Sequence, residues 1–565
     1  MHKNIFEQLE FDRLKGQKEG TVPEWMTTEG YQLLTQKYMD KGQTVLNRYQ
    51  VIAKTAASHM PDPSYWEPKF FELFWKGWLA ASTPVMANMG TDKGLPVSCS
   101  GGYIDDSIDG FYSTLHETAM LTKNGFGTSA YLGDIRPRGA PIRIGGQAAG
   151  VMPVIADYVQ CMRDVAQGNT RRGAWAGYLP LSHGDFDEVV TYLKNTPDDL
   201  NLGWNVYDKD VAALDSGDPE LGRRFSKALH TKLITGKGYF FFPDKVNRAN
   251  PPMYKDRGLT VKGSNLCTEI NLFSDHTHTF TCVLSSMNGA KYDEWKDTDA
   301  VFTATVFLDC VAQDFIIRAK EIPGLSKAVR FTEASRALGL GLLGYHTYLQ
   351  DNMIAFESFE AHMKNLEIFE HLNKESLRAS EWMAKELGEP EWCKGYGVRN
   401  THRLAIAPNT SSSLLCGGVS QGIEPLPGNC YIQPSAAGEL VRLNSSFIKF
   451  CERKGVPVDR KLINSINDKL GSVQHLDWMS DEEKLVFKTA YEIDQMAILR
   501  KAAARQPRIC QGQSLNLFFR AEEDEAVIAK VFQAAFKDEN IKQIYYLRTM
   551  AGLQASKEVG CIACE

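Results

Sequence analysis

Three side chains that could exchange protons or hydrogen atoms are spaced two positions apart in the segment SNLCTEINL, residues 264–272. They are the Asn265 amide, the Cys267 thiol and the Glu269 carboxylate. In an extended strand, this spacing places all three on one face. We therefore predict a polar face that presents an amide, a thiol and an acid side by side. The alternative is a buried cysteine in an ordinary strand, because free cysteine is commonly buried.

Four consecutive hydroxyl residues follow a proline turn in the stretch AIAPNTSSSLL, residues 405–415. They are Thr410, Ser411, Ser412 and Ser413. A helix that starts here would combine unpaired backbone N–H groups with hydroxyls, and such a combination can hold a phosphate group. Helix capping alone would account for only one or two of these side chains. We therefore predict a phosphate-binding loop.

Two further features lie near the end of the chain. Cys561 and Cys564 form a Cys-x-x-Cys pair, and Tyr545 is adjacent to Tyr546. No second cysteine pair is evident that would complete a zinc site. The Cys-x-x-Cys pair therefore favours thiol–disulfide exchange, with incidental cysteines as the alternative. The tyrosine pair on its own is typical of core packing.

Composition restricts the class of protein. The chain has 565 residues, with 63 basic and 69 acidic side chains and a net charge of −6. Its 12 cysteines make up about 2% of the residues, far below the roughly 8–10% of disulfide-built secreted scaffolds. The slightly acidic balance argues against a nucleic-acid polymer as partner, because such binders carry a basic patch. A disordered chain is also excluded.

No targeting or membrane segment is predicted. The N-terminus mixes charged and apolar residues and lacks the apolar core of a signal peptide. The longest apolar stretch, residues 301–320, is interrupted by Asp309 and Asp314, whereas a membrane span needs about 20 apolar residues. We expect a cytoplasmic protein with reduced thiols, in which a pair of cysteines is more often catalytic or metal-binding than structural.

The elements that must position these groups change along the chain. Residues 1–80 are predicted to be helical, with an interruption at Pro61 and Pro63. From about residue 81, short β-prone runs alternate with amphipathic helices, a pattern that predicts an α/β architecture. The last fifteen residues contain few large apolar side chains and are predicted to be a mobile tail.

Two helices can be placed by their end signals. One is predicted to begin at the cap residues Asp106 and Ser107 and to end at Gly125. The other is predicted to begin at Ser480, whose capping box with Glu483 precedes apolar residues as far as position 493. A Gly-x-Gly-x-x-Gly pattern at residues 339–344 follows a polar, helix-like stretch instead of a strand, so we do not expect a dinucleotide site there.

Taken together and in order, these segments resemble the large, catalytic subunit of class I ribonucleotide reductase from about residue 80 to the end. Any one of the segments is a weak signal, but all of them in sequence are specific. The matching segments are 83–86 (TPVM), 98–99 (SC), 264–269 (SNLCTE), 281–282 (TC), 410–413 with 422–425 (GIEP), 513–518 (QSLNLF), 545–546 (YY) and the terminal cysteine pair.

The resemblance implies the reduction of ribonucleotides, expected to be diphosphates, to 2′-deoxyribonucleotides by radical chemistry. Cys267 resembles the residue that becomes a thiyl radical and takes the 3′-hydrogen of the substrate. Glu269 would act as a general base on the 3′-hydroxyl, and Asn265 would hydrogen-bond the substrate hydroxyls. Cys99 and Cys282 resemble the dithiol that reduces the substrate and closes to a disulfide as water leaves.

The resemblance also gives roles to both features near the chain end. Cys561 and Cys564 would re-reduce the active-site disulfide and pass the oxidation to thioredoxin or glutaredoxin. Tyr545 and Tyr546 resemble the stacked pair that relays a radical to Cys267 from a separate small subunit. That subunit would carry the radical cofactor, of unknown metal, so no permanently bound cofactor or metal is expected on this chain. The relay favours class I over the adenosylcobalamin-dependent class II.

Substrate and effector sites follow from the same resemblance. Substrate phosphates would lie on Thr83, Ser98 and the hydroxyl run 410–413. A second site, for dNTP or ATP effectors that control substrate specificity, is expected at the start of the predicted helix and on two loops. Its residues are Asp106, Ser107, Arg136, Arg143, Gln167 and Arg171. Effector binding would couple to substrate choice through a loop with two arrangements.

The implied fold is a ten-stranded α/β barrel over residues 81–550, with Cys267 on a central loop, a helical region at 1–80 and a redox-active tail at 551–565. The longer family members start with a domain that binds ATP or dATP. Its opening motif does not precede Thr83, so we expect no overall shut-off by dATP. A homodimer through the helices around Asp106 is also expected. The alternatives are a class II enzyme, a plain thiol oxidoreductase, or a catalytically inactive nucleotide-binding homologue.

Overall fold

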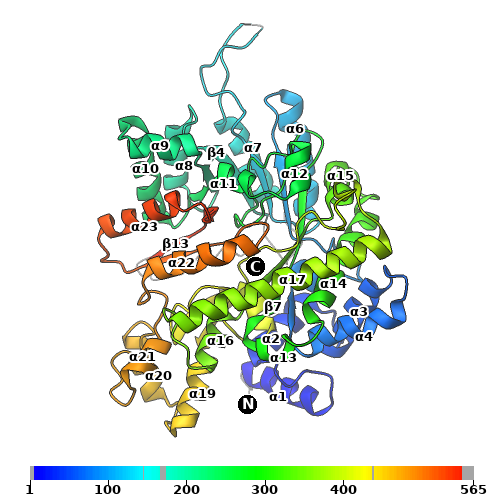
Figure 1. The fold of residues 1–565 in the computed structure, drawn as a ribbon, viewed down its shortest axis with the longest axis vertical. Helices are drawn as coiled ribbons and strands as arrows, with labels where there is room; N and C mark the ends of the chain where they lie inside the picture. The colour runs from blue at the N-terminus through cyan, green and yellow to red at the C-terminus, as the bar shows by residue number, and fades with distance from the viewer. Residues whose placement is uncertain (1–4, 144, 166–172, 436–437, 550–565) are drawn as a thin grey trace.

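Four α-helices form the N-terminal region, as predicted for residues 1–80. A computed structural model describes residues 5–143, 145–165, 173–435 and 438–549. The helices are α1 (Ile5–Lys18), α2 (Thr28–Leu33), α3 (Val45–Ala57) and α4 (Pro63–Trp75), drawn in blue in Figure 1. The predicted interruption falls between α3 and α4, where Asp62 caps α4 by accepting a hydrogen bond from Tyr65 N–H.

A curled sheet of nine strands forms the centre of the described chain, and all of its larger strands are buried. The strand order is β1-β7-β2-β3-β4-β5-β6-β12, with β8 paired to β7. The strands are β1 (Leu79–Ala81), β2 (Cys99–Tyr103), β3 (Thr128–Tyr131), β4 (Trp175–Pro180), β5 (Asn201–Asn205), β6 (Tyr239–Phe241), β7 (Phe280–Asn288), β8 (Leu338–Leu343) and β12 (Gln543–Ile544).

Two parallel halves meet in this sheet at an antiparallel junction. Strands β2 to β6 run parallel to one another, and β7 runs parallel to β8 but antiparallel to β2. Parallel neighbours need long crossover connections, and helices supply them. The crossovers after β2 to β5 contain α6 (Ile108–Lys123), α7 (Met152–Asp164), α8 (Phe186–Asn195), α9 (Asp208–Asp215) and α10 (Pro219–Thr235). The α/β prediction is therefore confirmed.

The sheet continues beyond β8 by single bridges. Leu340 in β8 bridges to Leu404, and Ile406 bridges to Gln513, both in parallel. The segment around residues 404–406 therefore occupies a tenth position beside the nine hydrogen-bonded strands. This segment leads directly into the hydroxyl run, because α18 (Thr410–Leu415) begins four residues later.

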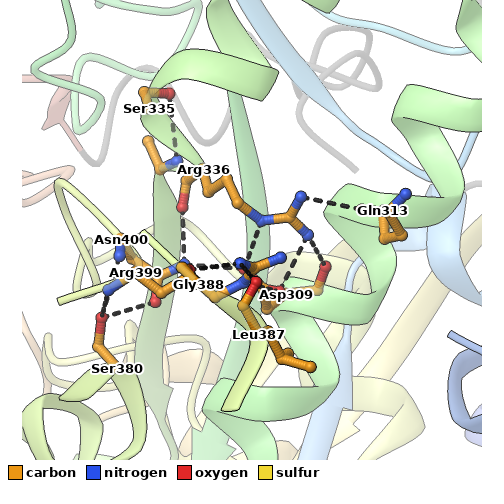
Figure 2. A network of polar contacts seen from close by, with 10 residues as sticks. Asp309, Gln313, Ser335, Arg336, Ser380, Leu387, Gly388, Arg399 and Asn400 are labelled. Atoms are coloured by element: carbon orange, nitrogen blue, oxygen red, sulfur yellow. Dashed lines mark hydrogen bonds and ion pairs between the residues drawn. The ribbon is translucent and has the colours of Figure 1, made fainter. Parts of the chain in front are cut away.

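Helix α14 (Ala300–Ala319) is a core helix that would pass for a membrane span. Its length and composition are those of a helix that could cross a membrane. The sequence argument that Asp309 and Asp314 exclude a membrane-spanning helix here is therefore wrong. However, 83% of its most apolar window is buried inside the protein. Its Asp309 carboxylate forms ion pairs with the guanidinium groups of Arg336 and Arg399, at 2.8 and 2.9 Å. These contacts belong to the network drawn in Figure 2.

The two helices placed by their end signals are both present. Helix α6 is capped by Ser107, whose hydroxyl accepts the Gly110 N–H at 3.0 Å, and Gly125 follows its end with a φ of 110°. Helix α21 (Asp481–Val486) has the predicted capping box between Ser480 and Glu483. Its predicted continuation to position 493 is wrong, because the chain turns after Val486 and the next helix begins at residue 495.

The remaining elements surround the sheet. Helix α17 (Phe359–Leu387) crosses in front of the sheet in Figure 1, and α19 (Ser445–Lys454), α20 (Arg460–Asp468) and α21 form a lobe at the lower left. The other elements are α5 (Thr83–Asn88), α11 (Pro243–Arg248), α12 (Pro252–Arg257), α13 (Tyr292–Trp295), α15 (Ser326–Ser335), α16 (Tyr345–Asp351), α22 (Gln495–Arg505), α23 (Glu525–Lys537), β9 (Cys430–Ser435), β10 (Gly438–Leu443), β11 (Leu517–Phe519) and β13 (Leu547–Thr549).

The glycine pattern at residues 339–344 lies in β8 and directly after it, preceded by α15, so it is not a dinucleotide turn. Gly339 instead makes room for Leu284 and the Cys282 thiol. A Cβ atom at this position would lie 2.5 Å from Leu284 Cδ2 and 2.9 Å from Cys282 Sγ. A side chain at 339 would therefore clash with β7 where it carries Cys282.

Candidate active site

Eight of the predicted catalytic and substrate-binding residues line one cavity. It contains about 610 Å³ of empty space, which includes space open to solvent. Cys267, Glu269 and Cys99 line it together. The hydroxyl and amide residues in its wall are Ser82, Thr83, Ser98, Ser285, Ser286, Asn409, Thr410, Ser411 and Ser412.

The segment that carries Cys267 is a turn and not a strand, so the prediction from its period of two is wrong. Thr268 adopts a left-handed conformation with a φ of 68°, which is uncommon for a β-branched residue. Its N–H donates to the Asn265 carbonyl at 3.3 Å, and the Asn265 amide oxygen accepts the Ile270 N–H at 3.1 Å. Cys267 lies at the tip of this turn, as the family resemblance implied for a central loop.

The turn separates Asn265 from the cavity wall. Its amide nitrogen instead donates to Cys99 Sγ at 3.5 Å. Asn265 therefore contacts one of the two predicted reducing cysteines, whereas Cys267 and Glu269 face the cavity itself.

Glu269 has the environment of an acid–base group. Burial raises the pKa of Glu269 to about 7, against the opposing effect of hydrogen bonds that include one from Ser514. The Ser514 hydroxyl donates to Glu269 Oε2 at 3.0 Å, and Oε1 has no hydrogen-bond partner among the described residues. A carboxyl with a pKa near neutrality can accept and return a proton at working pH.

Cys99 and Cys282 lie directly opposite each other where β2 meets β7. Opposed residues of antiparallel strands have Cα atoms about 4.5–5.5 Å apart, within the range that a disulfide requires. Their sulfurs are not bonded, and none of the ten described cysteines is in a disulfide. Burial raises the pKa of Cys282 well above its usual value, although Gln511 donates to its sulfur at 3.4 Å.

The hydroxyl groups gather at one part of the cavity wall, at the starts of α5 and α18. The hydroxyls of Ser82, Ser98 and Ser411 are buried and lack hydrogen-bond partners among the described residues. Buried hydroxyls are normally satisfied, so these three are available to a polar ligand. Ser413 differs from its neighbours. It lies outside the lining, and its hydroxyl donates to the Thr410 carbonyl at 2.9 Å within α18.

The Tyr545 and Tyr546 rings lie against each other in a tilted arrangement. Their ring centroids are 3.9 Å apart with an interplanar angle of 41°. Tyr545 is buried in the same hydrophobic cluster as Cys267, Cys99 and Cys282, and Tyr546 packs against that cluster. The pair is therefore packed into the core, as the dipeptide alone predicted, and it adjoins the thiol residues.

Part of the predicted effector site is assembled. Arg136 Nε donates to Asp106 Oδ2 at 2.5 Å, next to the start of α6. Ser107 caps α6 and also donates to Asp105 at 2.9 Å. Arg143 is exposed on a turn closed by the bridge between Pro141 and Gln147. Gln167, Arg171, Cys561 and Cys564 lie outside the described residues.

The sequence reasoning missed several residues of the site. Ser514 bonds both Glu269 and the Cys267 carbonyl, the latter at 2.6 Å. Asn409 lines the cavity and accepts the Ser286 hydroxyl at 2.9 Å. Ser514 lies inside the QSLNLF segment and Asn409 directly before the hydroxyl run, so the matched motifs marked their positions. Nothing in the sequence marked Ser82 or Gln511.

Comparison with known proteins gives the same result over most of the chain. A family model described as the ribonucleotide reductase barrel domain matches residues 97–218, 223–395 and 389–547, and one for the all-alpha domain matches residues 25–94. A ribonucleoside-diphosphate reductase large-subunit homologue of Frog virus 3 (isolate Goorha) is 35% identical over 554 residues, covering 94% of this chain and 95% of the other. The large subunit of Invertebrate iridescent virus 3 is 29% identical and covers 94% of each chain.

The fold matches as well. The class Id ribonucleotide reductase alpha subunit of Actinobacillus ureae superimposes with a TM-score of 0.87 at 39% identity, over 94% of this chain and 99% of the other. The matched barrel domain contains most of the cavity lining, the opposed cysteines, and Tyr545 and Tyr546. The chain belongs to the ribonucleotide reductase large-subunit family, as a class I catalytic chain that reduces ribonucleotides to deoxyribonucleotides.

Proposed function

We propose the following division of work among the residues of the cavity. Cys267, as a thiyl radical, takes the 3′-hydrogen of the ribonucleotide and becomes a thiol. Glu269 accepts the proton of the 3′-hydroxyl, and the 2′-hydroxyl leaves as water with a proton from the Cys99–Cys282 dithiol. That dithiol supplies two electrons, delivers its second hydrogen to C2′ and closes to a disulfide, after which Glu269 returns the proton to the 3′-oxygen and Cys267 returns the hydrogen to C3′. The observation that carries the proposal is the shared cavity of Cys267, Glu269 and Cys99.

Substrate phosphates are proposed to bind at the hydroxyl side of the same cavity. The buried hydroxyls of Ser98 and Ser411 have no partner among the described residues, and Thr83, Thr410 and Ser412 line the wall beside them. Ser413 is not part of this proposal. Asn265 acts on Cys99 in this scheme, because its amide donates to that sulfur.

The radical is proposed to reach Cys267 through Tyr546 and Tyr545 from a separate small subunit, which holds the radical cofactor. The contact of the two rings supports this path. Among the described residues, no group of three or more His, Cys, Asp or Glu side chains is arranged to hold a metal ion. We also propose that Cys561 and Cys564 reduce the active-site disulfide and are themselves reduced by thioredoxin or glutaredoxin.

Regulation and assembly complete the proposal. Asp106, Ser107 and Arg136, which lie together at the start of α6, are proposed to bind a dNTP or ATP effector with Arg143, Gln167 and Arg171. The chain is proposed to act in the cytoplasm as a homodimer. Its parts are a helical region at 1–80, a catalytic barrel at 81–550 and a redox tail at 551–565.

Replacement of Cys267 by Ser tests the central assignment. The variant should bind nucleotide as the parent chain does but form no deoxynucleotide with the small subunit and dithiothreitol. Turnover by this variant would refute the assignment. A parallel assay of the parent chain with adenosylcobalamin and no small subunit distinguishes class II chemistry. Absence of turnover under every condition, with nucleotide binding intact, would favour an inactive homologue.

A further inference from the structure

Tyr545 and Tyr546 lie where the chain changes its strand partner. Strand β12 pairs with β6 through Gln543 opposite Phe241 and Ile544 opposite Phe240. One residue further on, the backbone pairing to β6 ends, and after Tyr546 the chain pairs with β11 as β13. The positions of the two rings therefore depend on the residue at which the chain leaves β6.

A buried lysine lies at that point. Lys232, on α10, is 0% exposed. Its Nζ donates to the Gly238 carbonyl at 3.0 Å, just before β6, and also to the Tyr545 carbonyl. The Lys232 Nζ group thus bridges β6 and β12 at the point where the backbone hydrogen bonds between these two strands end.

The other backbone groups of the pair are held from the opposite side. Tyr545 N–H donates to the Leu515 carbonyl at 2.8 Å, and Tyr546 N–H donates to Asn516 Oδ1 at 3.1 Å. The Tyr546 carbonyl accepts the Leu517 N–H at 3.0 Å. Lys232 ties the backbone of the pair to the β6 side.

A third tyrosine contacts both rings from the same side as Lys232. The Tyr239 ring, in β6, lies 4.7 Å from the Tyr545 ring and 5.6 Å from the Tyr546 ring between centroids. It is 0% exposed, and its hydroxyl donates to Asn201 at 3.3 Å. Lys232 Nζ is 5.8 Å from the centroid of the same ring.

Lys232 has no negatively charged partner among the described residues. No carboxylate among the described residues forms an ion pair with it, and a buried cation without a counter-charge destabilises a fold. Burial lowers the pKa of Lys232 well below its usual value. Even the neutral amine keeps two N–H donors, enough for the two carbonyls that it contacts. A hydrophobic residue would fill this space at lower cost, so packing alone does not explain a lysine here.

We propose that Lys232 and Tyr239 are positioning residues of the radical relay, which hold Tyr545 where its ring contacts both Tyr546 and the cluster of Cys267. Lys232 fixes the Tyr545 carbonyl against β6, and the Tyr239 ring supports the Tyr545 ring. This inference rests on the proposed relay function of the tyrosine pair. It concerns the transfer step from Tyr546 to Tyr545 and not nucleotide binding.

A second buried lysine offers a matched control. Lys245 Nζ donates to the carbonyls of Ala535, Phe536, Asp538 and Ile541 in the same C-terminal stretch, at 2.7–3.3 Å. No contact between Lys245 and either tyrosine of the pair is seen in the described residues. Lys232→Met and Lys245→Met therefore each remove a buried lysine that holds carbonyls, but only the first touches the pair.

The test places 3-aminotyrosine, a more easily oxidised analogue, at position 545 or 546 of the full chain. Each probe is combined with Lys232→Met or Lys245→Met and mixed with the small subunit, substrate and effector. The radical yield at each position is measured by electron paramagnetic resonance. With Lys232→Met we expect the yield at 546 to equal that of the parent and the yield at 545 to fall at least tenfold, with a matching fall in kcat and an unchanged nucleotide KM. Lys245→Met should leave both yields unchanged.

Parent-like yields at both positions in Lys232→Met would overturn the proposal. Equal losses at both positions would also overturn it, because they would indicate a general structural role. Tyr239 gives an independent check if Lys232→Met does not fold. Tyr239→Phe should keep the yield at 545 and Tyr239→Leu should lower it, and identical behaviour of the two variants would count against the ring contact. If the parent chain itself gives no radical at either probe, the relay function fails, and not the role of Lys232.

Discussion

The Ser514 hydroxyl lies 3.0 Å from Glu269 Oε2, in a pocket where that carboxylate has no charged partner among the described residues. Burial raises the pKa of Glu269 to about 7, and the Ser514 hydrogen bond opposes this rise because it favours the ionised form. The same hydroxyl lies 2.6 Å from the Cys267 carbonyl oxygen, so its single hydrogen is shared between these two acceptors. Ser514 thus links the proposed base to the turn that carries the proposed radical site.

The first prediction concerns the pH dependence of turnover. Glu269 can act as a base only when ionised, so kcat/KM should fall as the pH decreases through about 7. Ser514→Ala removes a bond to the ionised form, raises the pKa of Glu269 further and should move this limb to higher pH. The measurement is the pH profile of kcat/KM. Ser376→Ala, which removes a buried hydroxyl on α17, serves as the control and should keep the parent profile. An unshifted limb in Ser514→Ala would disprove the link.

The second prediction concerns the opposed cysteines. Without external reductant, the chain should form only as much deoxynucleotide as its reducing dithiols allow, one product for each dithiol oxidised. Cys99→Ser and Cys282→Ser should each abolish this burst. The double variant Cys561→Ser with Cys564→Ser should halve it and should keep turnover with dithiothreitol but not with thioredoxin. Rapid-quench product counts and thiol titration measure these outcomes.

Cys161, on α7 and only partly buried, provides the control for the cysteine variants. Cys161→Ser should give the parent burst. A full burst from Cys282→Ser would show that the partner of Cys99 lies elsewhere.

The local elements of this fold could be predicted from the sequence because their signals are local. Ser107 and Gly125 bracket α6, and the capping box of Ser480 starts α21. The capping side chains form hydrogen bonds with groups only a few positions away in the sequence, so the residue types alone are enough to predict where these helices begin. The family, and with it the barrel, followed from several motifs in order and not from periodicity.

The detailed geometry of the site could not be predicted in this way. The spacing of Asn265, Cys267 and Glu269 suggested a strand, but the left-handed Thr268 turns the chain. Ser514 contacts Cys267 across 247 residues of sequence. Such contacts are set by how distant strands and turns pack, and a single sequence carries no periodic signal for them.

The third prediction concerns Gly339. Gly339→Ala would place a Cβ 2.5 Å from Leu284 Cδ2 and 2.9 Å from Cys282 Sγ. Overpacking of this kind costs about 1–3 kcal/mol, and here it would also displace a reducing sulfur. We expect a lower melting temperature and a slower single turnover. Gly222→Ala on α10 has open space around its new methyl group and should be neutral or stabilising by up to about 1 kcal/mol. Parent-like turnover in Gly339→Ala would show that Cys282 tolerates displacement.

The last prediction concerns the buried network around Asp309. Burial alone would raise the pKa of Asp309, but the charges of Arg336 and Arg399 lower this pKa to about 2. Asp309→Asn would leave two buried guanidinium groups without a counter-charge. Breaking a buried pair in this way costs about 3–5 kcal/mol. We expect a clearly lower free energy of unfolding, measured in urea near pH 7.

The pH dependence supplies an independent check of the same network. A carboxyl whose pKa is depressed in the folded state contributes stability above its unfolded value of about 4. This contribution should be lost as the pH falls through about 2, and Asp309→Asn should lack that part of the acid unfolding curve. Asp299→Asn breaks an exposed pair with Lys69 at the start of the same helix, and such pairs contribute about 0–1 kcal/mol. Equal effects of the two substitutions would mean that the two arginines do not depend on Asp309 for their charge balance.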